Sequence, residues 1–466
     1  MALPGCKNGL VKYNMIDHSS SRQPDIAIHS KNTVLPNGIS DVFLLIKDGS
    51  IYGIERSFGG GLSCPVKDVG DLVLMPGIVD SHVHINEPGR TDWEGFETAT
   101  KAALAGGITT LVDMPLNSTP VTTTPANFEK KLNAAHTKLH ANCGFWGGVV
   151  PENADQMGPL VECGVLGIKA FLVHSGIEDF PNVTKEDLGK AMPVIAGADL
   201  PLLVHSELEP LDWEPGEIND YLSFLHSRPR SWEDNAIALM IDLCRKHHCR
   251  THIVHLSSSN SLDALARAKE EGLPITVETC PHYLYFSAEA IPPNNTLFKC
   301  TPPIRERENN ELLWKGIKDG VIDLVVTDHS PAPLHMKNGA NLNFSNAWGG
   351  ISSLQYSLPA FWVKARNYGL DIQDVCRLMC EKPAELMGQS GIKGTLAIGA
   401  DADLTIWDPN STVTPASRDI HYKHPFTPFE DQPLMGKVHQ TYISGDCAYQ
   451  DGDFVSLQRG KLVLNQ

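Results

Sequence analysis

The sequence has no apolar run long enough to cross a membrane and no cluster of basic residues. A spanning helix needs about 18 or more apolar residues in succession, and no stretch of this chain approaches that length. Asp and Glu number 55 against 38 Lys and Arg, which gives a formal net charge of −17. Because nucleic acids and anionic membrane surfaces select basic patches, we expect neither nucleic acid nor membrane as a partner.

The sequence has no Cys-x-x-Cys pair, and we expect no targeting signal. The 11 cysteines are scattered without a Cys-x-x-Cys pair, which is typical of reduced, mostly buried thiols in an intracellular protein. The first residues, MALPGCKNGLVKYN, have neither the apolar core of a signal peptide nor a run of arginines, and the last three are not Ser-Lys-Leu. We therefore expect an intracellular protein, with the cytoplasm as the expected compartment and an organelle left open.

The two ends of the chain are both rich in short β-strand patterns. VFLLI (42–46) and IYGIE (51–55) flank a Gly-containing turn, and DLTIWD (403–408) and VHQTYI (438–443) repeat the style near the C-terminus. Each end is too short to form a domain by itself. We predict one small β-sandwich domain built from both ends, with the middle of the chain inserted as a second domain; the predicted parts are 1–71, 72–390 and 391–466.

The middle of the chain alternates apolar strand patterns with helical ones. Continuous apolar strands joined by helical crossovers indicate a parallel sheet covered on both faces. An open doubly wound sheet is the alternative to a closed barrel, but no strand is followed by a G-x-G-x-x-G loop. The prediction is an α/β fold, a (β/α)8 TIM-like barrel, with strands at 72–80, 108–114, 143–150, 165–173, 201–206, 251–257, 274–279 and 321–328.

Polar residues capable of binding metal follow several of these strands. In DSHVHINEPGR, His82 and His84 are two residues apart at a strand end, so their side chains point to the same side. The active sites of such barrels lie at the carboxyl ends of the strands. The candidate residues at those ends are His82, His84, Lys169, His205, His255 and Asp328.

Each candidate taken singly has an ordinary structural explanation. A lone histidine at a strand end is usually a satisfied structural residue, a lone aspartate before Ser-Pro is usually a cap, and a lone lysine usually reaches to water. Four imidazoles, a lysine and a carboxylate at equivalent positions of one barrel are better explained by a metal site, because neutral imidazole and carboxylate suit Zn²⁺ and similar metals. A neutral Lys169 amine can combine with CO₂ to give a carbamate with two ligand oxygens. His252 and His329 are predicted to face away from the site.

Eight motifs in fixed order resemble the cyclic-amidohydrolase branch of the amidohydrolase superfamily, which includes dihydroorotases, hydantoinases, dihydropyrimidinases and allantoinases. They are PGIVDSHVH, GIKAFL, LLVHSE, IVHLSS, VETCPHYL, KCTPPIR, VVTDHSP and KGTLAIGADADLTIWDP. The resemblance implies two divalent metal ions, Zn²⁺ in the first place with Co²⁺, Mn²⁺ or Fe²⁺ as alternatives. It assigns His82, His84 and Asp328 to one ion and His205 and His255 to the other, with a carboxylated Lys169 bridging them.

The same resemblance implies a catalytic role for Asp328 and an oligomeric state for the protein. Asp328 would act catalytically, taking a proton from the attacking water and returning it to the departing amide nitrogen. A homotetramer is expected from the family. Non-catalytic scaffold relatives that have lost ligands also exist, and the intact set of six residues favours an enzyme over a scaffold.

The substrate is predicted from the residues that follow the two histidines. Dihydroorotases usually have leucine and arginine there, and the arginine meets the substrate carboxylate, whereas this chain has Ile85 and Asn86. A neutral cyclic ureide is therefore expected, with Asn86 and Ser330 as substrate contacts and Arg90 as a structural ion-pair partner. The run beginning NEPGRTDW resembles the allantoinases, which open the hydantoin ring of allantoin to allantoate. Hydantoinase or dihydropyrimidinase activity is the alternative, and dihydroorotase activity is a further one.

Overall fold

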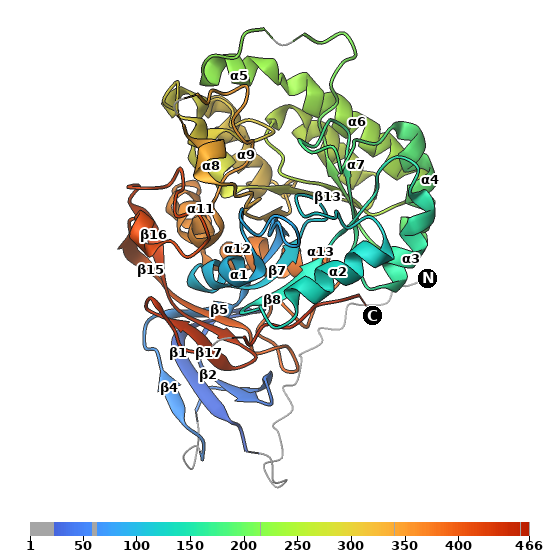
Figure 1. Ribbon diagram of the computed structural model, residues 1–466. Helices are drawn as coiled ribbons and strands as arrows, with labels where there is room; N and C mark the ends of the chain where they lie inside the picture. The colour runs from blue at the N-terminus through green and yellow to red at the C-terminus, as the bar shows by residue number, and fades with distance from the viewer. Residues whose placement is uncertain (1–22, 58–62, 215, 340, 457, 466) are drawn as a thin grey trace, which may run out of the picture.

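The computed structural model describes residues 23–57, 63–214, 216–339, 341–456 and 458–465. The stretch on which the expectation about targeting signals depends lies outside these residues. Figure 1 shows two regions: a barrel of strands surrounded by helices, and below it a β-rich domain in which N-terminal strands (blue) and C-terminal strands (red) lie together.

The barrel strands form two parallel sheets that meet at both edges. Strands β9 to β14 follow one another in chain order in the first sheet, and β6, β7 and β8 form the second. Trp146 lies between β8 and β9 and divides the predicted strand 143–150 in two. On this side the backbone N–H of Leu166, just before β10, donates to Phe145 O of β8 at 3.0 Å. Val83 bridges to His329 on the other side, which closes the ring. The strands are β6 (Ile78–Val83), β7 (Ile108–Asp113), β8 (Asn142–Phe145), β9 (Gly147–Gly148), β10 (Ile168–Phe171), β11 (Leu202–His205), β12 (Thr251–Ile253), β13 (Ile275–Thr279) and β14 (Leu324–Val325).

Helices between the strands cover the outside of the barrel (Figure 1). In α6, Trp232, Ala236, Met240 and Leu243 are buried at helical spacing, so one apolar face packs inward. The main helices are α1 (Phe96–Ala105), α2 (Pro125–Ala135), α3 (Met157–Glu162), α4 (Lys185–Gly197), α6 (Arg230–His247), α7 (Leu262–Glu270), α9 (Arg307–Lys318) and α11 (Ser357–Ala365). Shorter ones are α5 (Tyr221–Ser227), α8 (Pro281–Tyr285), α10 (Leu334–Lys337), α12 (Ile372–Cys376) and α13 (Lys382–Leu386).

The β-rich domain is one sheet that joins both ends of the chain. Strands β5 and β15 connect the two halves, since Leu74 lies opposite Ile406 and Pro76 opposite Leu404. Its order is β18-β17-β16-β15-β5-β1-β2-β3, with β4 paired to β1. The strands are β1 (Ile26–Leu35), β2 (Gly38–Lys47), β3 (Ser50–Glu55), β4 (Val66–Asp68), β5 (Val73–Pro76), β15 (Leu404–Val413), β16 (Leu434–Ile443), β17 (Asp446–Gln450) and β18 (Asp453–Phe454).

The predicted strand 72–80 is two strands that belong to different sheets. Strand β5 pairs with β1 and β15 of the β-rich domain, and β6 pairs with β7 of the barrel. Gly77 lies between them, and a Cβ placed there would be 2.0 Å from Thr109 Oγ1. Only glycine allows the chain to pass this close to β7, so Gly77 fixes where the chain leaves one domain and enters the other.

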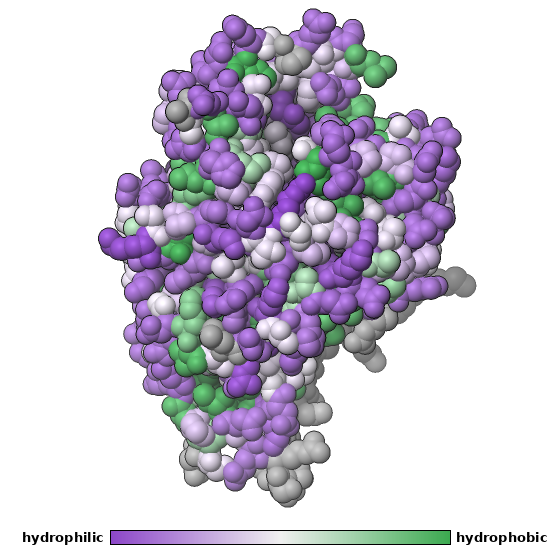
Figure 2. All heavy atoms as spheres, in the orientation of Figure 1, coloured by the Kyte–Doolittle hydropathy of each residue, from purple (hydrophilic) through white to green (hydrophobic). Residues whose placement is uncertain are grey.

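One face of the molecule is predominantly polar (Figure 2). On the face shown in Figure 2, hydrophilic residues dominate and hydrophobic ones are scattered. Among the described residues, no helix combines the length and apolar character that crossing a bilayer requires.

Candidate metal centre

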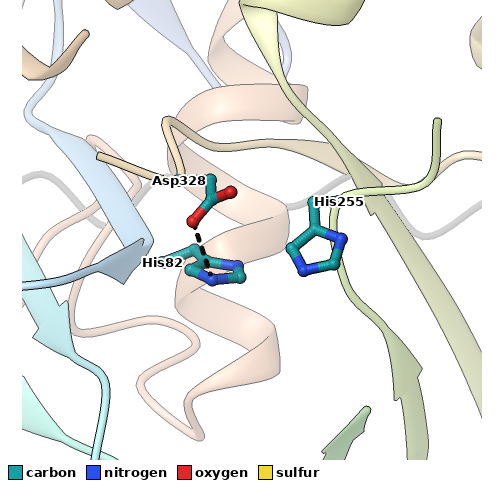
Figure 3. Close-up of side chains that lie close together, drawn as sticks. All are labelled: His82, His255 and Asp328. Atoms are coloured by element: carbon teal, nitrogen blue, oxygen red, sulfur yellow. Dashed lines mark ion pairs between the residues drawn. The ribbon is translucent and has the colours of Figure 1, made fainter. Parts of the chain in front are cut away.

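His82, His255 and Asp328 converge at the carboxyl end of the barrel strands. One ligand atom from each lies within 4.8 Å of the others, and all three side chains are buried. Figure 3 shows Asp328 above the His82 ring, with Nε2 of His82 at 3.2 Å from Asp328 Oδ1, and His255 on the other side. The spacing is that of groups able to share one cation.

Left-handed backbone conformations turn two of these side chains into the site. His255 has a φ of 37° and Asp328 a φ of 46°. Residues other than glycine rarely adopt such values, and they cluster at functional sites where the fold holds them. Because both residues follow the last regular residue of their strands, strand alternation alone does not determine their direction.

The other predicted ligands lie around this trio. His84 Nε2 is 3.6 Å from Asp328 Oδ1. The His205 ring is 4.6 Å from the His255 ring, centre to centre, and stacks on Phe171. Lys169 Nζ lies 5.0 Å from the centre of that Phe171 ring. The structure therefore brings all six predicted residues to one end of the barrel.

Burial favours the uncharged form of His84 and His255. Desolvation lowers the pKa of His84 to about 4 in spite of the nearby Asp328 carboxylate. The pKa of His255 is well below its usual value because of burial and the neighbouring His205, Lys169 and His82. Neutral imidazoles are the form that binds a metal ion, so this donor set fits Zn²⁺ or a similar divalent cation.

Lys169 is an orphaned buried amine. The side chain is fully buried, and Nζ has no hydrogen-bond partner among the described residues. Burial lowers its pKa to about 8, although the Glu278 and Asp328 carboxylates favour the charged form. A buried amine without an acceptor is costly, and the cost is relieved if the amine carries a group that binds the metal centre.

Glu278 is a buried carboxylate of the site that the sequence reasoning missed. Its Oε1 lies 2.5 Å from His82 Nδ1 and accepts from the His255 backbone N–H at 3.1 Å, and its Oε2 lies 2.9 Å from His252 Nε2. Burial by itself raises the pKa of Glu278, but His82 and His252 outweigh burial. The net pKa is below the usual value, so the carboxylate is ionised. The signal was available, since a glutamate within the apolar strand β13 (ITVET) needs a buried partner.

The two histidines predicted to face away have defined partners. His252 bonds the carboxylate that orients His82, so it lies beside the site and supports it, contrary to the prediction. His329 is turned away from Asp328 as expected, with Nε2 3.4 Å from Glu94 Oε2 and Nδ1 accepting from the Ser353 backbone N–H.

A second carboxylate, Glu207, orients His205. Its Oε2 is 2.7 Å from His205 Nε2, which leaves His205 Nδ1 as the nitrogen available to a metal. Arg228 donates to both oxygens of Glu207, from Nε at 3.0 Å and Nη2 at 2.5 Å. Burial raises the pKa of Glu207, and Arg228 and His205 overcome that effect and lower it to about 2. Carboxylates that hold metal-binding imidazoles in this way fix the ring and raise its basicity.

The cluster opens into a cavity of about 420 Å³. His82, His84, His255 and Asp328 line it, and Ser330 also reaches it, as a substrate contact must. The volume suits a small ring.

Asn86 is not among the residues that line the cavity. Its amide is buried and its Nδ2 donates to Pro331 O at 3.2 Å, so it fastens the turn after Asp328. Arg90 has no ion pair among the described residues, contrary to the prediction. Its guanidinium lies 5.0 Å from the Trp93 ring centre and donates to Asn117 O at 3.3 Å.

Comparison with known proteins agrees with this geometry. Residues 73–448 match the profile of the Amidohydrolase family. The chain is 43% identical to an allantoinase of Streptomyces avermitilis, covering 95% of this chain and 99% of that one, and 41% identical to an allantoinase of Saccharomyces cerevisiae, covering 91% and 93%. Among solved structures, the L-hydantoinase (dihydropyrimidinase) from Arthrobacter aurescens superposes with a TM-score of 0.89 at 28% identity, covering 95% of this chain and 100% of that one.

Proposed function

The chain belongs to the amidohydrolase family, and from that premise we propose that it hydrolyses the ring amide of allantoin to give allantoate. The observation that carries the proposal is the buried cluster of His82, Asp328 and His255 in a chain that aligns with allantoinases over nearly its whole length. Water adds to a ring carbonyl carbon, the carbon–nitrogen bond breaks, and the nitrogen leaves with a proton.

We propose two divalent metal ions as cofactors, with Zn²⁺ first and Co²⁺, Mn²⁺ or Fe²⁺ as alternatives. His82, His84 and Asp328 would hold one ion, and His205 and His255 the other. Lys169, carboxylated on Nζ, would supply an anion shared by both. Such ions polarise a carbonyl and supply a water that is acidic enough to be deprotonated near neutral pH.

We propose that Asp328 carries the proton of the reaction. It lines the cavity, and its Oδ1 is within 3.2 Å of His82 Nε2. Burial raises the pKa of Asp328, but the neighbouring His82 and His84 imidazoles more than reverse this and lower it, so the carboxylate is ionised at neutral pH. An ionised carboxylate at the cavity can accept a proton from water and return it to the departing nitrogen.

We propose Ser330 as a contact to the substrate ring and Asn86 as a support of the Asp328 turn. A cyclic ureide of this size suits the cavity. Hydantoin or dihydropyrimidine hydrolysis is the second candidate, because the solved structures of similar fold include an L-hydantoinase. We also propose a homotetramer and an intracellular location.

The test is metal content together with substrate preference of the purified protein. Allantoin, hydantoin, dihydrouracil and dihydroorotate are compared at equal metal loading. Fastest turnover of allantoin supports the proposal, and preference for dihydrouracil or dihydroorotate overturns it. A protein that binds no metal and opens none of the four rings is a scaffold.

A further inference from the structure

Two cationic side chains line the active-site cavity although neither belongs to the predicted ligand set. Arg228 follows α5, and Lys299 follows β13 by 20 residues in the sequence. The two residues directly after His84, Ile85 and Asn86, carry no positive charge, which is why a site without a cation is expected from the sequence. The cations are supplied by distant loops, and each has donor capacity left over.

Lys299 has one N–H unaccounted for. It is almost wholly buried, at 8% exposure. Its Nζ donates to Ala347 O at 2.7 Å and to Ser345 O at 3.2 Å. An ammonium has three N–H donors and no acceptor. Nζ lies 5.5 Å from the centre of the Phe224 ring, but no third hydrogen-bond acceptor is found among the described residues. Since Lys299 lines the cavity, the third donor is available to a bound molecule.

Arg228 also has a hydrogen-bond donor that is not used within the protein. Its Nε and Nη2 are taken by Glu207, whereas Nη1 has no acceptor among the described residues. Glu207 forms an ion pair with Arg228. Burial lowers the pKa of Lys299 to about 8, with Arg228 adding to the effect. The exposed carboxylate of Glu209 lines the same cavity. This wall therefore offers hydrogen-bond donors with little net positive charge.

We infer that Lys299, with Arg228 beside it, forms a subsite that recognises an uncharged carbonyl arm attached to the substrate ring. The inference rests on the proposed function and deepens it, because allantoin carries such an arm, a ureido group, whereas hydantoin is the same ring without it. A carboxylate arm, as in dihydroorotate, is less suited because Glu207 and Glu209 offset the cations. Lys299 is thus a specificity-determining residue.

Lys337 provides a matched control. It is buried like Lys299, and its Nζ donates to Lys299 O at 2.8 Å and Trp348 O at 2.9 Å, so it holds the same loop. It is not among the residues that line the cavity. Lys337→Met therefore reports what loosening the loop does, and Lys299→Met reports that effect plus the loss of the donor.

The experiment measures kcat/KM for allantoin and the inhibition constant of hydantoin in the metal-loaded wild type and both variants. A hydrogen bond to a charged donor corresponds to roughly a 10- to 100-fold effect. Relative to Lys337→Met, we expect Lys299→Met to lower kcat/KM for allantoin by about that factor and to leave hydantoin binding within about twofold. If Lys299→Met does not fold, Lys299→Leu, which also lacks the donor, is used, and the ratio of the two constants is the readout in either variant.

The outcomes separate the two proposals. An unchanged ratio, with allantoin and hydantoin weakened equally, overturns the subsite and leaves Lys299 as a support of the loop. Wild-type turnover of hydantoin as fast as allantoin also overturns the subsite, while hydrolysis of cyclic ureides stands. Preference of the wild type for dihydroorotate overturns both the proposed function and the uncharged arm.

Discussion

Glu278 Oε1 lies 2.5 Å from Nδ1 of His82, across 196 residues of sequence, and both side chains are buried. The contact fixes the His82 ring so that Nε2 faces Asp328. The same carboxylate also accepts from the backbone N–H of His255. Glu278 therefore holds both the His82 ring and the backbone at His255, two predicted ligands from different strands.

Replacing Glu278 with glutamine should weaken metal binding. The amide keeps the shape of the side chain but removes the negative charge that orients and polarises His82. Loss of such a partner typically lowers metal affinity by about 10- to 100-fold, and metal titration by competition with a chromophoric chelator measures it. Glu94→Gln is the control, since Glu94 pairs with His329 outside the predicted ligand set; equal metal affinity in Glu278→Gln and the wild type would contradict the role.

Asp328→Asn should abolish turnover while some metal is retained. Asparagine is isosteric and keeps a ligand oxygen, but it cannot accept and return a proton at neutral pH. General acid–base groups contribute about 10²- to 10⁴-fold, so kcat for allantoin should fall by at least that range. Metal content is determined on the same sample by mass spectrometry. Near-normal kcat in a metal-loaded Asp328→Asn enzyme is incompatible with the proton role.

Metal removal should expose a requirement for CO₂. If Lys169 is carboxylated, chelation leaves the amine free to lose its carbamate, and full activity should return only when metal and bicarbonate are added together. Metal alone at low CO₂ should restore a minor part of the activity. Lys169→Arg, which cannot form the carbamate, should gain nothing from bicarbonate; equal recovery of the wild type with and without bicarbonate argues against the modification.

His29 in β1 should make a pH-dependent contribution to stability. Desolvation lowers the pKa of His29, but hydrogen bonds to Asp41 at 2.8 Å and Asp68 at 2.9 Å more than reverse it, and the net shift is upward. A raised pKa in the folded state stabilises the protein below the ordinary value of about 6.5, and the gain disappears as the pH rises through the folded-state pKa.

His29→Gln should therefore lower the free energy of unfolding more at pH 5.5 than at pH 8.5. The two carboxylates are largely exposed, at 63% and 65%, so the difference is expected to be at most about 1 kcal/mol. Urea denaturation of both proteins at the two pH values measures it. A larger loss at pH 8.5 than at pH 5.5 would reverse the sign and exclude the ion pairs as its cause.

The sequence by itself determined the barrel and the ligand candidates. Both follow from local rules: the alternation of apolar strands with helices predicts parallel strands, and residues two apart, such as His82 and His84, share a side of a strand. Because barrel strands end at the same face, candidates at different strand ends could be grouped before their distances were known. Neither prediction depended on knowing the contacts between distant segments.

Only the tertiary structure decided which groups support those candidates and what else reaches the cavity. Glu278 lies within β13, whereas Arg228 and Lys299 lie in loops, and no spacing in the sequence relates any of the three to His82 or His205. Strand alternation also could not predict where the His255 and Asp328 side chains point, because both residues have a left-handed backbone beyond the end of the regular strand. Hydrogen bonds between residues far apart in sequence exist only once packing has brought the strand ends together, and for that reason they cannot be read from local patterns.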